Sequence, residues 1–173
     1  MLEVIQFFQQ NGFKTYIVSG GGQEFIRAYA EDSYQIPPDC IIGTAIKVKY
    51  ENDDGEIKLL RTPNILFVNE KEGKAEAINL IIGRKPVAAF GNSDGDRQML
   101  EYTWSNKGLA VLIHHDDTFR EYAYDNYSKV GKLTNEFMEE AQERNYQIVS
   151  MRKDWNTLFA WQKTLPKSPR VQE

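Results

Sequence analysis

Ser19 and the glycines that follow it form one of three polar segments whose residue types suit a phosphorylated ligand. Ser19 follows the apolar run Tyr16-Ile17-Val18 and precedes Gly20, Gly21 and Gly22. Its hydroxyl and the free backbone N–H groups of the glycine turn are donors that can hold an anion at a helix N-terminus. Serine is also a common helix N-cap, and by itself this segment favours that simpler interpretation.

Asn92, Asp94 and Asp96 form the second segment, directly after the apolar run Val87–Phe90. They supply the hard oxygen ligands that Mg²⁺ prefers, while leaving room for water and a phosphate. Acidic residues are also frequent in turns and at helix caps. However, three oxygen-bearing side chains within five positions are more than a cap requires, so we predict a Mg²⁺ site at Asn92, Asp94 and Asp96.

Lys74 is the third candidate, at the start of an expected helix. A lysine at this place can neutralise a phosphate or a carboxylate. Most helix lysines are solvated surface residues, so Lys74 has weight only together with the other two segments.

The apolar runs predict the elements that carry these residues. Buried strands are expected at 13–18, 86–90 and 109–113, with a short strand at 147–151, and helices at 2–10, 23–32, 71–82 and 134–145. Strands without alternation, separated by helices, indicate a parallel sheet covered on both faces, so the predicted fold class is α/β, three-layered and Rossmann-like. In such folds ligands bind beyond the carboxyl ends of the strands, where Ser19 and Asn92 lie.

One part of the sequence changes from this pattern to strict alternation. Ile46, Val48 and Tyr50 alternate with charged residues before the turn Asn52–Gly55. We therefore expect a β-hairpin excursion at about 41–62. The length of 173 residues, with 41% hydrophobic residues, predicts a single domain over 1–165 and a loose tail at 166–173.

Charge and composition exclude several classes of function. The formal net charge of −4 and the pI of about 5.3 argue against nucleic-acid binding. No apolar run approaches the roughly 20 residues that span a bilayer, and no signal peptide is visible, so we expect no membrane partner and a cytoplasmic location. Cys40 is the only cysteine, which excludes an intramolecular disulfide.

His114 and His115 have no third ligand at a recognisable spacing and are interpreted as surface or supporting residues rather than a zinc site.

The order of the three segments resembles the haloacid dehalogenase superfamily, in particular its phosphoserine-phosphatase-like branch. Ser19 matches the family's second motif, Lys74 the third, and the strand with its acidic loop, Val87–Asp96, the fourth. The resemblance covers about residues 1–125, and the loop 91–96 is its most specific part. It implies a Mg²⁺-dependent phosphomonoester hydrolase acting on a small phosphorylated substrate, with Ser19, Gly20 and Lys74 binding the phosphate.

The family's first motif, a strand followed by Asp-x-Asp-x-Thr or Ser, has no match in this sequence, because Asp94-Gly95-Asp96 already belongs to the fourth motif and Asp116-Asp117-Thr118 has the wrong spacing. Its first aspartate is the nucleophile that forms an aspartyl-phosphate, so the resemblance implies a truncated form that is inactive alone. It also implies that the central strand of the sheet is absent. We expect the unpaired edges to favour self-association or complementation by a missing N-terminal segment. Two alternatives stay open: a non-catalytic phosphate- or metal-binding or interaction domain, and a phosphotransferase or mutase of the same family.

Overall fold

The computed structural model describes residues 1–159, so the predicted tail at 166–173 and the predicted domain end at 165 lie outside the described residues. The elements in chain order are α1 (Leu2–Gln10), β1 (Ile17–Gly22), α2 (Gln23–Tyr34), the 3₁₀ turn η1 (Pro38–Cys40), β2 (Ile41–Asp53), β3 (Glu56–Phe67), α3 (Glu72–Ala77), the π-helical turn η2 (Ile78–Ile82), β4 (Ala88–Gly91), the 3₁₀ turn η3 (Asp94–Asp96), α4 (Arg97–Trp104), β5 (Leu109–His114), α5 (Asn135–Glu143) and β6 (Gln147–Ser150). No helix in this part of the chain is long and apolar enough to cross a membrane.

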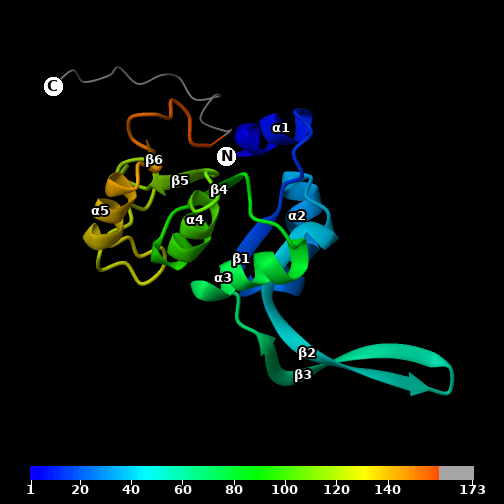
Figure 1. The fold of residues 1–173 in the computed structure, drawn as a ribbon. Coiled ribbons are helices and arrows are strands. Elements are labelled where there is room, and N and C mark those ends of the chain that lie inside the picture. The colour runs from blue at the N-terminus through cyan, green and yellow to red at the C-terminus, as the bar shows by residue number, and fades with distance from the viewer. Residues whose placement is uncertain (160–173) are drawn as a thin grey trace.

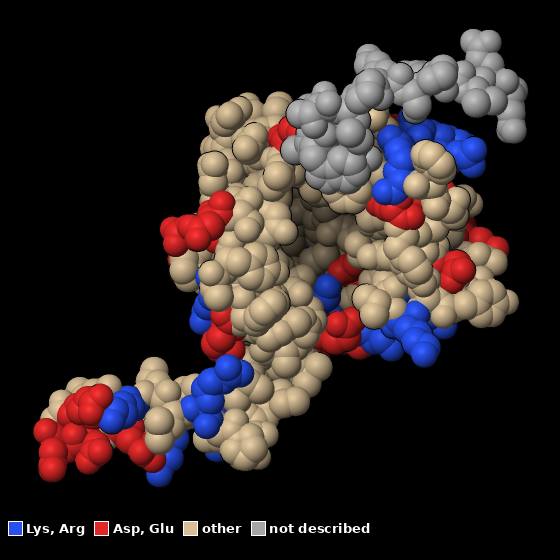
Figure 2. All heavy atoms as spheres, turned by 180° about the vertical axis from the view of Figure 1, so that it is seen from behind, with Lys and Arg blue, Asp and Glu red and all other residues tan. Residues whose placement is uncertain are grey.

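The strands form two three-stranded sheets, ordered β1-β2-β3 and β4-β5-β6 (Figure 1). The pairs β1–β2, β4–β5 and β5–β6 are parallel, and helices lie on both sides of the sheets, which confirms the predicted α/β class. Among the described residues, β1 and β4 each have one hydrogen-bonded neighbour. Figure 2 shows a hollow on the face seen there, between the part of the molecule that carries the hairpin and the rest.

β5 is the most deeply buried strand, and its side chains pack against the cores on both faces of its sheet. Ala110 and Leu112 belong to a core with α4 and α5, whereas Val111 and Ile113 pack with Met151 on the other face. This division follows because successive side chains of a strand point to opposite faces of the sheet. A strand that is buried on both faces therefore has a continuous apolar sequence. The burial explains why the sequence predicted this strand correctly.

The hairpin of β2 and β3 extends away from the body of the molecule (Figure 1). Asp54 and Gly55 have φ values of 47° and 93°, as the central residues of a tight hairpin turn require. The hairpin is longer than the predicted segment, because β3 continues to Phe67. The first residues of β2 pair in parallel with β1, with Ile17 opposite Ile41, so this end of β2 belongs to the body of the fold.

Candidate phosphate and metal site

A buried ion pair joins two of the three predicted segments. Lys74 in α3 and Asp96 at the end of η3 are 7% and 6% exposed, and Lys74 Nζ lies 2.5 Å from Asp96 Oδ1. A buried ammonium or carboxylate is costly unless it is paired, so each charge keeps the other in place. An ammonium group has three N–H donors, and this contact uses one of them.

Asp96 also fixes the shape of the loop that it ends. Its Oδ2 accepts hydrogen bonds from the backbone N–H of Asn92 at 2.9 Å and of Ser93 at 3.2 Å, within a capping box formed with Ser93. A Cβ on Gly91 would lie 2.5 Å from the Cβ of Asp96, so the loop closes only over a glycine. Asp96 is therefore the structural centre of the 91–96 loop.

Asp94 faces a different part of the chain. Its Oδ1 accepts hydrogen bonds from the backbone N–H of Thr134 at 2.9 Å and from the Thr134 hydroxyl at 3.1 Å. Thr134 is the N-cap of α5, where its hydroxyl oxygen accepts from the N–H of Phe137. Asp94 thus links the loop to the start of α5, and its role as a metal ligand stays a prediction.

Ser19 lies in β1, which spans Ile17–Gly22, so the predicted strand at 13–18 ends too early and the predicted glycine turn after Ser19 is wrong. Ser19 also does not cap α2. The N-cap of that helix is Gly22, without a side-chain cap bond, so the N-cap interpretation of Ser19 is wrong. The Ser19 hydroxyl oxygen instead accepts from the N–H of Gly21 at 3.1 Å, which leaves its own hydrogen available for an acceptor. The carbonyl of Ser19 accepts from the side chain of the fully buried Asn69 at 2.8 Å, and the same amide donates to Ile42 in β2.

Glu70 lies between the serine segment and the acidic loop, and it is not among the candidate residues that the sequence indicated. A Cβ placed on Gly20 would overlap Oε2 of Glu70, and a Cβ placed on Gly95 would overlap Oε1 of the same carboxylate. The carboxylate therefore lies between Gly20 of β1 and Gly95 of η3, next to Asn69 and four residues before Lys74. No motif marks Glu70 among the acidic residues of the chain. The available signal was its place in the short segment between the buried Asn69 and Lys74.

His115 supports the loop from the side of β5. Asn92 Nδ2 lies 3.4 Å from His115 Nε2, and His115 Nδ1 lies 2.9 Å from Glu121 Oε2. If the amide donates to Nε2, the ring carries its hydrogen on Nδ1 and donates it to Glu121. In that arrangement the Asn92 carbonyl oxygen faces away from the histidine, and His115 positions the side chain of a candidate metal ligand.

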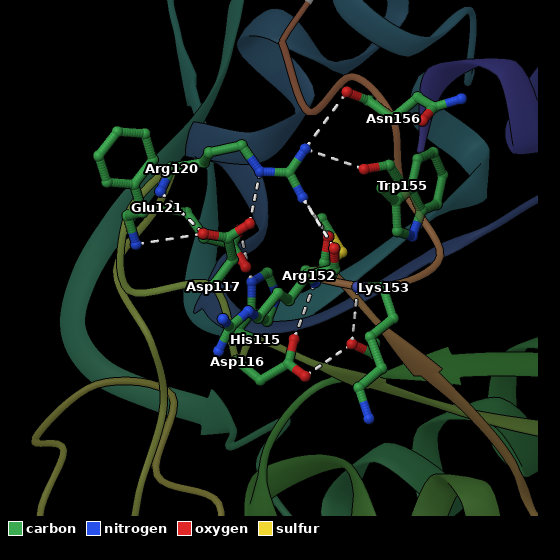
Figure 3. Close-up of polar contacts among 12 residues, drawn as sticks. His115, Asp116, Asp117, Arg120, Glu121, Arg152, Lys153, Trp155 and Asn156 are labelled. Atoms are coloured by element: carbon green, nitrogen blue, oxygen red, sulfur yellow. Dashed lines mark hydrogen bonds and ion pairs between the residues drawn. The ribbon is translucent and has the colours of Figure 1, made fainter. Parts of the chain in front are cut away.

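Asp116 and Asp117 after β5 organise the following segment (Figure 3). Burial raises the pKa of Asp116, but hydrogen bonds from the Ser150 hydroxyl and the Arg152 N–H outweigh it and lower the pKa overall. Burial likewise raises the pKa of Asp117, and hydrogen bonds from the Arg120 side chain and backbone lower it overall. Both carboxylates are thus anchors of the chain rather than proton donors at neutral pH.

The candidate site offers oxygen ligands of the kind that Mg²⁺ prefers, but few of them. The described residues contain no group of three His, Cys, Asp or Glu side chains that could hold a metal ion. Mg²⁺, however, usually keeps several waters and takes one or two carboxylates together with substrate phosphate oxygens. The Asn92 carbonyl and the carboxylates of Asp96 and Asp94 are the candidate ligands, and the contacts of both carboxylates leave lone pairs free.

Comparisons with known proteins give a limited result. No protein-family model matches the sequence, and no curated protein matches it. A phosphoserine phosphohydrolase-like protein from Francisella tularensis subsp. tularensis SCHU S4 is similar in structure, with a TM-score of 0.40 and 22% sequence identity over 82% of this chain. This chain spans 60% of the length of that protein.

Proposed function

We propose that this chain is the phosphate- and metal-binding part of a Mg²⁺-dependent phosphomonoester hydrolase. The observation that carries the proposal is the position of the Glu70 carboxylate between Gly20 and Gly95, close to the start of α3, where Lys74 pairs with Asp96. A carboxylate group therefore already fits between Gly20 and Gly95. We propose that donors from Ser19, Lys74 and the backbone next to Gly20 bind a phosphate in that space.

Each residue has a defined task in the proposed reaction. The Ser19 hydroxyl and the two remaining N–H groups of Lys74 donate to phosphoryl oxygens, and their charge and dipoles stabilise the transition state. Asn92, Asp96 and Asp94 hold Mg²⁺, which when bound neutralises phosphoryl charge. We propose that the attacking carboxylate comes from a segment other than those named here, because Asp94-Gly95-Asp96 already belongs to the acidic loop and no other strand of this sequence is followed by Asp-x-Asp.

Hydrolysis of p-nitrophenyl phosphate with Mg²⁺ tests the proposal, in this chain and in a natural protein that includes upstream residues. We expect activity in the longer protein, abolished by Asp96→Ala and unchanged by Asp53→Ala at the exposed hairpin turn. Activity in neither form would favour the alternative of a non-catalytic phosphate-binding domain. Activity in this chain alone would contradict the assignment of the nucleophile to another segment.

Binding of inorganic phosphate to this chain tests the proposed phosphate site independently of catalytic turnover. Ser19→Ala removes one hydrogen bond to a charged ligand and should weaken phosphate binding about tenfold. Ser33→Ala, at an exposed position of α2, is the matched control. Equal phosphate affinity in Ser19→Ala and the unchanged chain would exclude Ser19 from the site.

A further inference from the structure

The hairpin of β2 and β3 has one apolar face that no other described residue covers. Residues that pair across two antiparallel strands point to the same face of a sheet. This face carries the pairs Tyr50–Leu59, Val48–Arg61 and Asn52–Ile57. Its large apolar side chains are between 44% and 66% exposed: Val48, Tyr50, Ile57 and Leu59. We call these four residues the hairpin face.

The opposite face of the hairpin is charged, with Leu60 as an exception, and its charges pair within the chain. Lys49 pairs with Glu51 at 3.0 Å, and Lys58 pairs with Glu56 at 2.8 Å. Water therefore suits this face. The hairpin face is different, because a two-stranded hairpin is marginally stable in water unless its apolar side packs against another layer. Something that covers the hairpin face would stabilise it.

Two charges lie at opposite ends of the hairpin face. Arg61 is at the end nearer the body of the molecule, and Asp54 is in the turn at the tip. Neither side chain has an ion-pair partner among residues 1–159. Figure 2 shows acidic side chains gathered at the far end of the hairpin. The hairpin face is therefore basic at one end and acidic at the other, so it is complementary to a reversed copy of itself.

We propose that the hairpin face binds the same face of a second copy of this chain, with the two hairpins antiparallel about a two-fold axis. Tyr50 and Leu59 lie at the axis, and each packs against the same residue of the second copy. Arg61 then lies over Ile57 of the second copy. The turn begins two residues beyond this level, roughly 7 Å along the strands, which an arginine side chain can span. Arg61 thus pairs with Asp54 of the second copy, and the symmetry forms this pair twice.

The charges decide both the orientation and the kind of partner. In a parallel arrangement the two acidic turns would lie together and repel each other. A lipid surface is a poor partner, because cytoplasmic membrane surfaces are negatively charged and attract basic segments, whereas the tip of this hairpin carries Asp53, Asp54 and Glu56. A face that is complementary to itself is what a two-fold dimer requires.

Sedimentation velocity over a wide range of protein concentrations tests the proposal with the full chain. A standard protein interface buries about 800 Å² on each partner, and four side chains of one hairpin supply less, so we expect a dimer with a micromolar dissociation constant. Leu59→Ser should raise this constant at least about tenfold, because the change acts at the axis and occurs twice in the dimer. Leu80→Ser, at a 77% exposed position of η2, is the matched control and should leave the constant unchanged.

Circular dichroism checks that Leu59→Ser folds, as expected for a side chain that is 66% exposed in the single chain. A protein that stays monomeric at every concentration would overturn the proposal. A dimer that Leu59→Ser leaves unchanged would also overturn it, since association would then use another surface, such as the free edges of β1 and β4. Binding to phosphatidylcholine–phosphatidylglycerol vesicles that Leu59→Ser abolishes, in a protein that forms no dimer, would overturn it in favour of a lipid surface.

Reversal of the two charges tests the antiparallel orientation separately. Arg61→Glu and Asp54→Lys should each weaken the dimer several-fold, and the double variant should restore its affinity, because each pair forms again with the charges exchanged. Lysine is tolerated at the φ of 47° of Asp54, since Lys71 and Lys107 have similar φ values of 51° and 58°. A double variant that dimerises no better than either single variant would overturn the proposed pairing of the two hairpins.

Discussion

Arg120 is the centre of a network that holds the segment after β6 against the body of the fold. We expect its substitution to be among the single changes that destabilise the fold most. Its guanidinium pairs with Asp117 and donates to the carbonyl oxygens of Met151 at 2.8 Å and Trp155 at 2.9 Å (Figure 3). Further contacts reach the carbonyls of Arg152 and Asn156 at 3.3 Å each. The side chains of Asp117 and Arg120 are 6% and 22% exposed.

Arg120→Met should lower the free energy of unfolding by about 3 kcal/mol at about pH 7, because it leaves a buried charge without its partner. Urea unfolding followed by circular dichroism measures the change. Lys49→Met is the matched control: it breaks the pair of Lys49 with Glu51, whose side chains are 69% and 39% exposed, and should cost less than about 0.5 kcal/mol. Adding Asp117→Asn to Arg120→Met should recover part of the loss, since both charges are then gone.

The pH dependence gives the sharpest test of this reasoning. The pKa of Asp117 is lowered in the folded chain, so its contribution to stability is present above the unfolded pKa of about 3.9 and is lost as pH falls through the folded pKa. In Arg120→Met the effect of burial remains and the pKa of Asp117 rises. The difference in unfolding free energy between the two proteins should therefore shrink from about pH 7 to about pH 3.5. A difference that stays constant over this range would refute an ionic origin.

Three further predictions concern the fold and the site. Gly43→Ala should lower the unfolding free energy by about 1–3 kcal/mol in urea titrations, because its Cβ would lie 2.7 Å from the backbone of Gln23, whereas Gly22→Ala, in open space, should change it by less than about 0.5 kcal/mol. Asp94→Ala and Thr134→Ala should each cost about 1 kcal/mol, and the double variant should cost less than their sum, because both break the same link to α5. Glu70→Gln should tighten the binding of inorganic phosphate in the absence of metal, since it removes a negative charge between Gly20 and Gly95.

The sequence predicted β5 well because its apolar run is unbroken, whereas it placed the first strand at 13–18 and the structure has β1 at Ile17–Gly22. It could not predict that the first residues of β2 pair with β1, because Ile41 and Ile42 are continuous in sequence with the alternating hairpin. It grouped Asn92, Asp94 and Asp96 as equivalent oxygen ligands, whereas the structure gives each a different partner. Those partners, His115, Thr134 and Lys74, lie between 22 and 40 residues away in the chain, and no local pattern reports such contacts. Glu70 was missed for the same reason.

The charges around the candidate site lead to a prediction about the order of binding. Lys74 is one ammonium group, and the carboxylates of Glu70, Asp94 and Asp96 outnumber it. A phosphate dianion entering this site is therefore repelled unless a divalent cation enters with it. Phosphate affinity should thus increase with Mg²⁺, and because coupling between two ligands is reciprocal, phosphate should raise the affinity for Mg²⁺ by the same factor. Calorimetric titration of each ligand in the absence and presence of the other measures both factors. Tight phosphate binding without Mg²⁺ would mean that Lys74 and the backbone donors next to Ser19 suffice, and that the acidic loop serves the fold rather than a metal.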